Sequence, residues 1–289
     1  MLAFWTILTA SLVAVACALL GCYLVLRKMA MVSDAISHSI LPGLLLAFLI
    51  TGSRDSVTML VGAAALGLLT TLIIEFLHRK GNLQSDAAIG VTFTALFAIG
   101  IILITIFAEK VDFDQECVLY GEIAYTPLDE WILPNGYSLG ARTAWLMGAI
   151  LLLVLAFISL AYKELLITSF DASFALAIGI SSSLWHYVLM GMVSLVTVTA
   201  FESVGAILVV ALLICPAATA YLLTQRINRM LWLSAVIGVL IAVLGYYLAV
   251  WIDGSVAGAM ATVAGLLFLL ALLFSPVDGV WKNKWQKAN

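Results

Sequence analysis

The sequence predicts an all-α, polytopic membrane protein that crosses the bilayer about nine times. Hydrophobic residues fill 64% of the 289 positions and charged residues only 10%, whereas about 45–50% apolar residues is usual in soluble domains. Several apolar stretches are long enough to cross the roughly 30 Å of bilayer hydrocarbon. These stretches cover residues 4–26, 33–51, 57–77, 87–108, 142–162, 182–201, 203–224, 231–251 and 255–274. We therefore expect one transmembrane domain over residues 1–289, divided near Glu202 where a single long apolar region must form two helices.

Basic residues between the stretches predict the orientation, because Lys and Arg gather in cytoplasmic loops. With the N-terminus outside, the basic residues near the ends of the stretches fall on the inner face. These residues are Arg27, Lys28, Arg79, Lys80, Lys163, Arg226, Arg229, Lys282, Lys284 and Lys287. We expect an outer N-terminus and a cytoplasmic C-terminus. A formal net charge of -3 without a basic patch gives no basis for a nucleic-acid partner.

Residues 33–43, Ser-Asp-Ala-Ile-Ser-His-Ser-Ile-Leu-Pro-Gly, place a polar run at the threshold of the second stretch. In a helix Asp34 and His38 would stand at i and i+4 and project from the same face. A carboxylate and a neutral imidazole suit zinc, manganese or ferrous iron, and ionisable groups inside a span usually mark a transport pathway. We predict metal contacts for both residues. The alternative is that Ser33 and Asp34 only cap a helix N-terminus.

Further polar and helix-breaking residues lie at 42–43, in the second apolar stretch, and at 202–216. Three roles fit Glu202: a third metal ligand, a charge at the entrance of the path, or an acid that suits the start of a helix. Pro42, Gly43 and Pro216 interrupt helical hydrogen bonding, which lipid tolerates only where the freed backbone is buried in protein or lines a cavity. We therefore expect helix breaks at these three positions.

The longest predicted loop, 109–141, is acidic and would lie outside. Its acids are Glu109, Asp112, Asp114, Glu116, Glu122, Asp129 and Glu130. Such a surface can dock a soluble partner or concentrate cations. A merely solvated loop is the alternative.

Residues 170–180 are too short to span the membrane and too apolar for an ordinary inner loop. Asp171 can cap a short helix, Gly179 can end it, and Phe170 and Phe174 are one turn apart. A helix with an apolar side fits a groove on a partner protein. It could equally rest on membrane lipid.

Catalytic motifs are missing from the sequence. It contains no G-x-x-x-x-G-K-[ST] loop, nucleophile elbow or HExxH, so ATP would have to be hydrolysed by another chain. The four cysteines show no disulfide or zinc spacing, and we expect His78 and His186 to be structural. We predict a protein that is not itself an enzyme and holds no cofactor.

The chain resembles the permease subunit of bacterial zinc, manganese and, in some members, iron ABC importers. The resemblance covers nearly the whole chain, and Asp34-x-x-Ser-His38-x-x-Leu-Pro42-Gly43 is its most specific part. The other matching segments are Gly21-Cys22-Tyr-Leu-Val-Leu-Arg27, Phe170-Asp171 to Ala177-Ile-Gly179-Ile, Val204-Gly205-Ala-Ile-Leu-Val and Pro216-Ala-Ala-Thr-Ala220. The family usually has Asp-Pro-Glu where this chain has Asp171-Ala172-Ser173, and Pro-Ser-Gly where it has Asp253-Gly254-Ser255, which leaves Asp253 without a role.

By this resemblance Asp34 and His38 match positions that meet the metal, and residues 170–180 match the loop that couples to the ATPase. The resemblance implies a fold like that of the vitamin B12 importer permease, in the bacterial inner membrane. It also implies the partners: a second permease, either identical or a paralogue, separate ATP-binding cassette ATPases and an extracellular or periplasmic metal-binding protein. We expect transport of a divalent metal ion. The alternatives are an ion-coupled secondary transporter and an ABC permease for a metal chelate.

Overall fold

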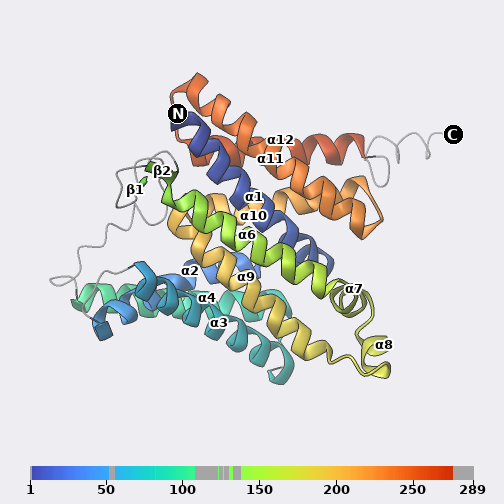
Figure 1. Cartoon of the computed structure of the whole chain (residues 1–289). Helices are drawn as coiled ribbons and strands as arrows, with labels where there is room; N and C mark the ends of the chain where they lie inside the picture. The colour runs from blue at the N-terminus through green and yellow to red at the C-terminus, as the bar shows by residue number, and fades with distance from the viewer. Residues whose placement is uncertain are drawn as a thin grey trace.

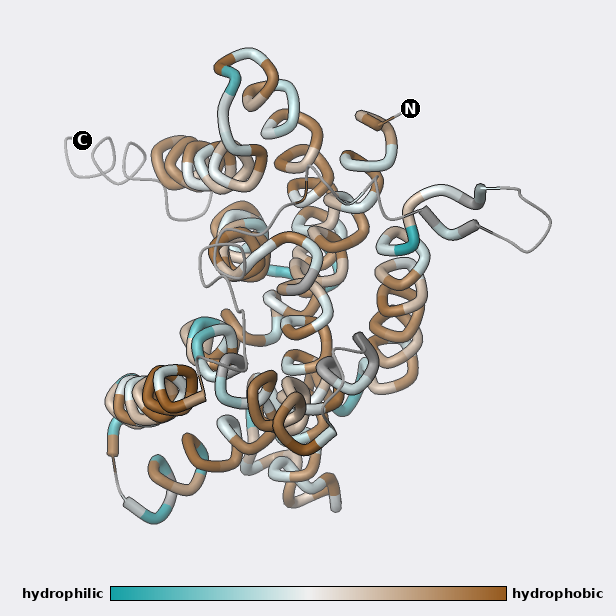
Figure 2. The backbone as a smooth tube through the Cα atoms, turned by 90° about the vertical axis from the view of Figure 1, so that its left-hand side faces the viewer, coloured by the Kyte–Doolittle hydropathy of each residue, from teal (hydrophilic) through white to brown (hydrophobic). Residues whose placement is uncertain are grey.

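The computed structural model describes residues 2–51, 56–81, 83–107, 123, 126, 130–132 and 138–275. The helices are α1 (Leu2–Leu26), α2 (Val32–Thr51), α3 (Ser56–Lys80), α4 (Ser85–Phe107), α6 (Arg142–Leu160), α7 (Tyr162–Phe170), α8 (Ala172–Ala177), α9 (Ser182–Val204), α10 (Ala206–Leu223), α11 (Ile227–Ile252) and α12 (Val256–Phe274). Within these ranges, nine helices are long and apolar enough to cross a membrane, namely all except α7 and α8. Figure 2 shows that the helices are apolar over most of their length. The predicted all-α polytopic fold is confirmed, whereas the orientation of the termini stays a prediction.

The long helices form two packed groups that are joined by α9 (Figure 1). One group consists of α2, α3 and α4, and the other of α1, α10, α11 and α12. Helix α9 touches α2 and α3 on one side and α1, α6 and α10 on the other. Side chains near the start of α9 can therefore reach residues of the first group.

Small residues allow the helices to approach closely. A Cβ atom added to Gly21 of α1 would lie 1.8 Å from the carbonyl oxygen of Leu213 in α10, and one on Gly245 of α11 would lie 2.4 Å from the Met260 side chain in α12. Lipid-embedded helices associate through such close packing rather than through the hydrophobic effect. Gly21 therefore fixes the contact between α1 and α10.

The boundary between α9 and α10 lies at Gly205, three residues after Glu202, near which it was predicted. Gly205 has φ 80° and ψ 162°, a conformation that residues with a Cβ rarely adopt. Its amide still donates to the carbonyl of Phe201. The backbone conformation of Gly205 ends α9, and Glu202 lies in the last turn of that helix.

The predicted helix breaks at Pro42, Gly43 and Pro216 are wrong, because α2 and α10 continue through these residues. Pro42 is buried, and a Cβ atom on Gly100 of α4 would lie 2.8 Å from its Cδ. A Cβ atom on Gly43 would lie 2.9 Å from the carbonyl oxygen of Gly62 in α3. The surrounding helices bury the proline-altered turn, which is the condition under which proline is tolerated in a membrane helix.

A short hairpin pairs β1 (Glu130–Ile132) with β2 (Ser138–Ala141) in antiparallel register. A Cβ atom on Gly140 would meet the ring of Trp5, so the hairpin lies against the beginning of α1. Most of the predicted acidic loop at 109–141 lies outside the described residues. Helix α6 runs from this hairpin to α7, which places α7 and α8 at the opposite end of the bundle (Figure 1).

Candidate metal site

Asp34 and His38 lie on consecutive turns of α2 and face each other. The His38 Nε2 atom is 3.5 Å from the Asp34 Oδ1 atom, and each side chain is 33% exposed. Two ligands that bind one ion tetrahedrally at about 2.1 Å are separated by roughly 3.4 Å. The pair therefore has the spacing of two ligands that can share an ion, and it is accessible to one.

Aromatic residues of α4 hold the imidazole of His38 in place. The ring centroid of His38 lies 5.6 Å from that of Phe93 and 5.7 Å from that of Phe97. Both contacts fall within the range of favourable aromatic packing. Helix α4 thus forms an apolar wall beside the pair of Asp34 and His38.

The alternative in which Ser33 and Asp34 only cap α2 agrees with the structure in one respect, because Asp34 lies in the first turn of α2. The observed contacts add a pairing that capping alone does not explain. The Ser33 hydroxyl donates to the carbonyl of Ala30 at 3.0 Å instead of accepting an amide hydrogen. Asp34 pairs with the His38 ring. The carboxylate is thus oriented along the face that carries the imidazole.

The pair needs further ligands to form a complete shell. Among the residues with described positions, no group of three or more His, Cys, Asp and Glu side chains could hold a metal ion. The side chain of Glu202 lies outside the described part of the structure, so its role as a third ligand stays a prediction. Asp253 caps the end of α11 in the left-handed conformation (φ 51°, ψ 46°), which gives it a structural role in the connection to α12.

The predicted short helix at 170–180 is present as α8, with a different arrangement of its aromatic residues. Asp171 caps α8, since its Oδ1 accepts the amide hydrogen of Phe174 at 2.9 Å, and Gly179 follows with φ 84°. The hydrogen bond from this amide lowers the pKa of the Asp171 carboxyl. Phe170 ends α7, so it does not share a helix with Phe174 as predicted; the extended backbone at Asp171 (φ -144°) separates them.

Helix α8 nevertheless presents an apolar surface at the edge of the bundle (Figure 1). Phe170 is 66% exposed and Phe174 54%, and Leu176 and Ile178 beside them are also exposed. Connecting segments that expose several large apolar side chains mark interaction sites.

Arg27 attaches the end of α1 to α7, which carries this surface. Its guanidinium donates to the hydroxyls of Thr168 at 2.9 Å and Ser169 at 3.1 Å. Burial lowers the pKa of Arg27 to about 10, so the group remains charged at neutral pH. These bonds connect α7 to the segment between α1 and α2, the helix that carries Asp34 and His38.

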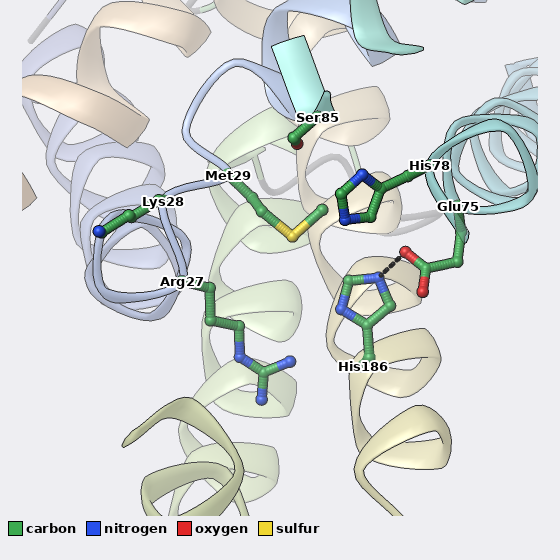
Figure 3. A pocket seen from close by; sticks show the side chains of 7 residues that line it. All are labelled: Arg27, Lys28, Met29, Glu75, His78, Ser85 and His186. Carbon is green, nitrogen blue, oxygen red and sulfur yellow. Dashed lines mark ion pairs between the residues drawn. The ribbon is translucent and has the colours of Figure 1, made fainter. Parts of the chain in front are cut away.

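Glu75 of α3 is a buried acid in an otherwise apolar span. Its Oε2 atom lies 3.1 Å from Nε2 of His186 in α9, and the two side chains are only 5% and 12% exposed (Figure 3). A carboxylate within an otherwise apolar stretch often has a functional role, so the sequence alone draws attention to Glu75.

Comparison with known proteins identifies the family. A family model described as the ABC 3 transport family matches residues 1–275. The chain is 51% identical over 285 residues to the manganese transport system membrane protein MntD of Bacillus subtilis (strain 168), covering 99% of this chain and 96% of that protein. It is 44% identical to the zinc transport system membrane protein TroD of Treponema pallidum (strain Nichols), covering 95% of this chain and 74% of that one.

A solved structure supports the same family assignment. PsaBC from Streptococcus pneumoniae, in complex with Fab, matches with a TM-score of 0.78 and 34% identity over 97% of this chain and 94% of that one. An inward-facing metal-chelate type ABC transporter matches with a TM-score of 0.66 at 17% identity, over 93% of this chain and 85% of that one, a likeness of fold alone. The predicted resemblance to metal-importer permeases is confirmed, and the chain is a multi-pass membrane protein of the ABC 3 transport family.

Proposed function

We propose that this chain is the membrane-spanning permease of an ATP-driven importer for a divalent transition metal. The observation that carries the proposal is the accessible Asp34 and His38 pair, 3.5 Å apart, inside a chain of the ABC 3 transport family. Oxygen and imidazole ligands suit manganese, zinc and ferrous iron alike. Manganese is the first candidate, because the 51% identical relative is named as a manganese transport protein.

Import requires that the pair replaces part of the ion's hydration shell and then releases it. Two protein ligands with water in the remaining positions bind an ion weakly, as conduction requires. The apolar wall formed by Phe93 and Phe97 leaves the ion no alternative ligands on that side. The ion would pass between two permeases, with Glu202 as a candidate third contact.

Partner proteins would supply energy and specificity. The apolar surface of α8 fits a groove on an ATP-binding cassette ATPase, and nucleotide-driven movement would reach the metal-binding loop through α7 and Arg27. An outer metal-binding protein would deliver the ion on the face that carries the hairpin. In this assembly the permease itself catalyses no reaction.

Transport into reconstituted vesicles tests the proposal. Vesicles that contain the permease, its ATPase and the binding protein should accumulate Mn²⁺ only when ATP is present. Accumulation by the permease alone, driven by an ion gradient, would contradict the proposal and identify a secondary transporter. Uptake that requires a metal chelate and ignores free Mn²⁺ would identify a chelate permease instead.

A further inference from the structure

Arg27 is a half-buried cation whose observed partners are both uncharged. It directly follows α1, and its guanidinium donates to the hydroxyls of Thr168 at 2.9 Å and Ser169 at 3.1 Å in α7. Within the described part of the chain, no carboxylate forms an ion pair with it. Hydroxyls are weaker partners for a guanidinium than a carboxylate is, so the observed contacts leave Arg27 without its strongest kind of partner.

Glu164 has the opposite deficit, one turn before Thr168 in α7. Its Oε2 atom is buried and accepts no hydrogen bond from any residue whose position is described. A buried carboxylate oxygen that lacks a donor is unfavourable. Residues 164 and 168 are four positions apart and therefore share a face of the helix. The contact between α1 and α7 thus contains a cation that lacks an acid and an acid that lacks a donor.

A single hydroxyl separates the two groups. Thr168 Oγ1 donates to the carbonyl oxygen of Glu164 at 2.7 Å and accepts a hydrogen bond from Arg27. At roughly 100° per residue, Glu164 and Thr168 differ by about 40° around the axis of α7. A small rotation of α7, or a change of rotamer at Glu164, can therefore bring the carboxylate to the guanidinium.

We propose that Arg27 alternates between two partners on α7: the hydroxyls of Thr168 and Ser169, as observed, and the carboxylate of Glu164. Helix α7 leads directly into α8, whose apolar surface is the proposed ATPase contact, so this switch rests on the proposed function. Movement of α8 during the nucleotide cycle would rotate α7 and favour one partner over the other. The exchange gives α7 two defined positions relative to the end of α1, as interlocking elements in switching proteins have.

Glu75 is the competing acid, because it lines a pocket of about 320 Å³ together with Arg27. Its carboxylate already lies 3.1 Å from Nε2 of His186. Figure 3 shows the Arg27 guanidinium directed away from Glu75. The contacts of Arg27 lie on α7 instead, which favours Glu164 as the second partner.

Hydrogen exchange in the purified complex of permease and ATPase tests the switch. Exchange of the α7 amides is measured by mass spectrometry without nucleotide and with ATP bound to a hydrolysis-deficient ATPase. Glu164→Gln removes one partner of Arg27 and Thr168→Val removes another. Each variant should speed α7 exchange about tenfold or more in one nucleotide state only, and the two variants should do so in opposite states. Lys163→Gln removes an exposed charge beside Glu164 and should leave exchange unchanged in both states.

Arg27→Gln removes the donor that both positions share. On this background, Glu164→Gln and Thr168→Val should have no further effect on α7 exchange. If Arg27→Gln does not assemble, as judged by size-exclusion chromatography, the opposite nucleotide dependence of the two α7 variants decides the question.

Three results would overturn the proposal. The first is α7 exchange in Glu164→Gln equal to that of the unmutated complex in both states. The second is exchange that is faster in both states, which would show a purely structural role for Glu164. The third is a state-specific effect of Glu75→Gln in place of Glu164→Gln, because Arg27 would then pair with Glu75.

The outcome is separable from that of the proposed function. If the unmutated complex imports Mn²⁺ with ATP while Glu164→Gln leaves α7 exchange unchanged, the switch is wrong and the importer stands. If the unmutated complex imports no free Mn²⁺, the proposed function fails whatever the exchange of the α7 variants.

Discussion

His38 Nε2 lies 3.5 Å from Asp34 Oδ1 across one turn of α2, and a third of each side chain remains accessible. The spacing is longer than an ordinary hydrogen bond and close to that of two ligands around one ion. The buried pair of Glu75 and His186 lies closer, at 3.1 Å. The first pair is therefore partly exposed at the surface of the chain, whereas the second is buried.

The apolar surface of α8 predicts the effect of Phe174→Asp. Burying a phenylalanine side chain contributes about 1.5–3 kcal/mol, and a carboxylate in its place would be desolvated without a partner. Co-purification of the ATPase with the permease should fall about tenfold or more, while Phe174→Leu should retain the complex. A complex that co-purifies equally well with Phe174→Asp would show that α8 does not dock the ATPase.

The Asp171 cap predicts a difference between two substitutions. Asn also accepts an amide hydrogen at a helix N-terminus and Ala does not, so Asp171→Asn should retain α8 and Asp171→Ala should loosen it. Hydrogen exchange at the Phe174 amide measures this: faster exchange is expected only in Asp171→Ala. Equal exchange in both variants would show that the side chain does not hold the helix.

The same cap predicts a pH dependence. The Phe174 amide holds the pKa of the Asp171 carboxyl below its ordinary value. The carboxyl pKa is about 3.9 in the unfolded state and lower in the folded state. The cap therefore stabilises the fold fully at a pH above the unfolded-state pKa, and this contribution is lost as the pH falls through the folded-state pKa. Protection of the Phe174 amide should therefore be constant from about pH 5 to 8. A loss of protection near neutral pH would contradict the assignment.

Close packing between α1 and α10 predicts that Gly21→Ala destabilises the protein. The added methyl group would lie 1.8 Å from the Leu213 carbonyl oxygen, and overpacking of this kind costs about 1–3 kcal/mol. Gly148→Ala in α6 is the matched control, because a Cβ atom at Gly148 would have no neighbour within 4 Å beyond the adjacent backbone of its own helix. Thermal unfolding in detergent should show a lower midpoint for Gly21→Ala only. A midpoint equal to that of Gly148→Ala would mean that the two helices can separate freely.

Much of this architecture could be predicted from the sequence because the bilayer imposes one strong requirement. Long apolar stretches must become helices, and the helix boundaries found for α1, α2 and α12 lie close to the predicted ones. The i, i+4 spacing of Asp34 and His38 likewise fixed their common face once α2 was helical.

Features that depend on contacts between distant segments could not be predicted in this way. Pro42 was expected to break α2, but Gly100 of α4 packs against it and the helix continues. The boundary at Gly205 depends on a backbone conformation that the charge at Glu202 does not indicate. The pairing of His186 with Glu75 joins residues more than a hundred positions apart, where spacing rules carry no information.

Metal uptake by the Asp34→Ala and His38→Ala variants tests the central claim most directly. The unmutated permease, assembled with its ATPase and binding protein in vesicles, should accumulate Mn²⁺ with ATP. Each variant should still assemble with the ATPase but reduce accumulation to that of vesicles without ATP, because the ion loses a ligand that replaces its hydration. Accumulation at the unmutated rate in both variants, with intact assemblies, would contradict the account.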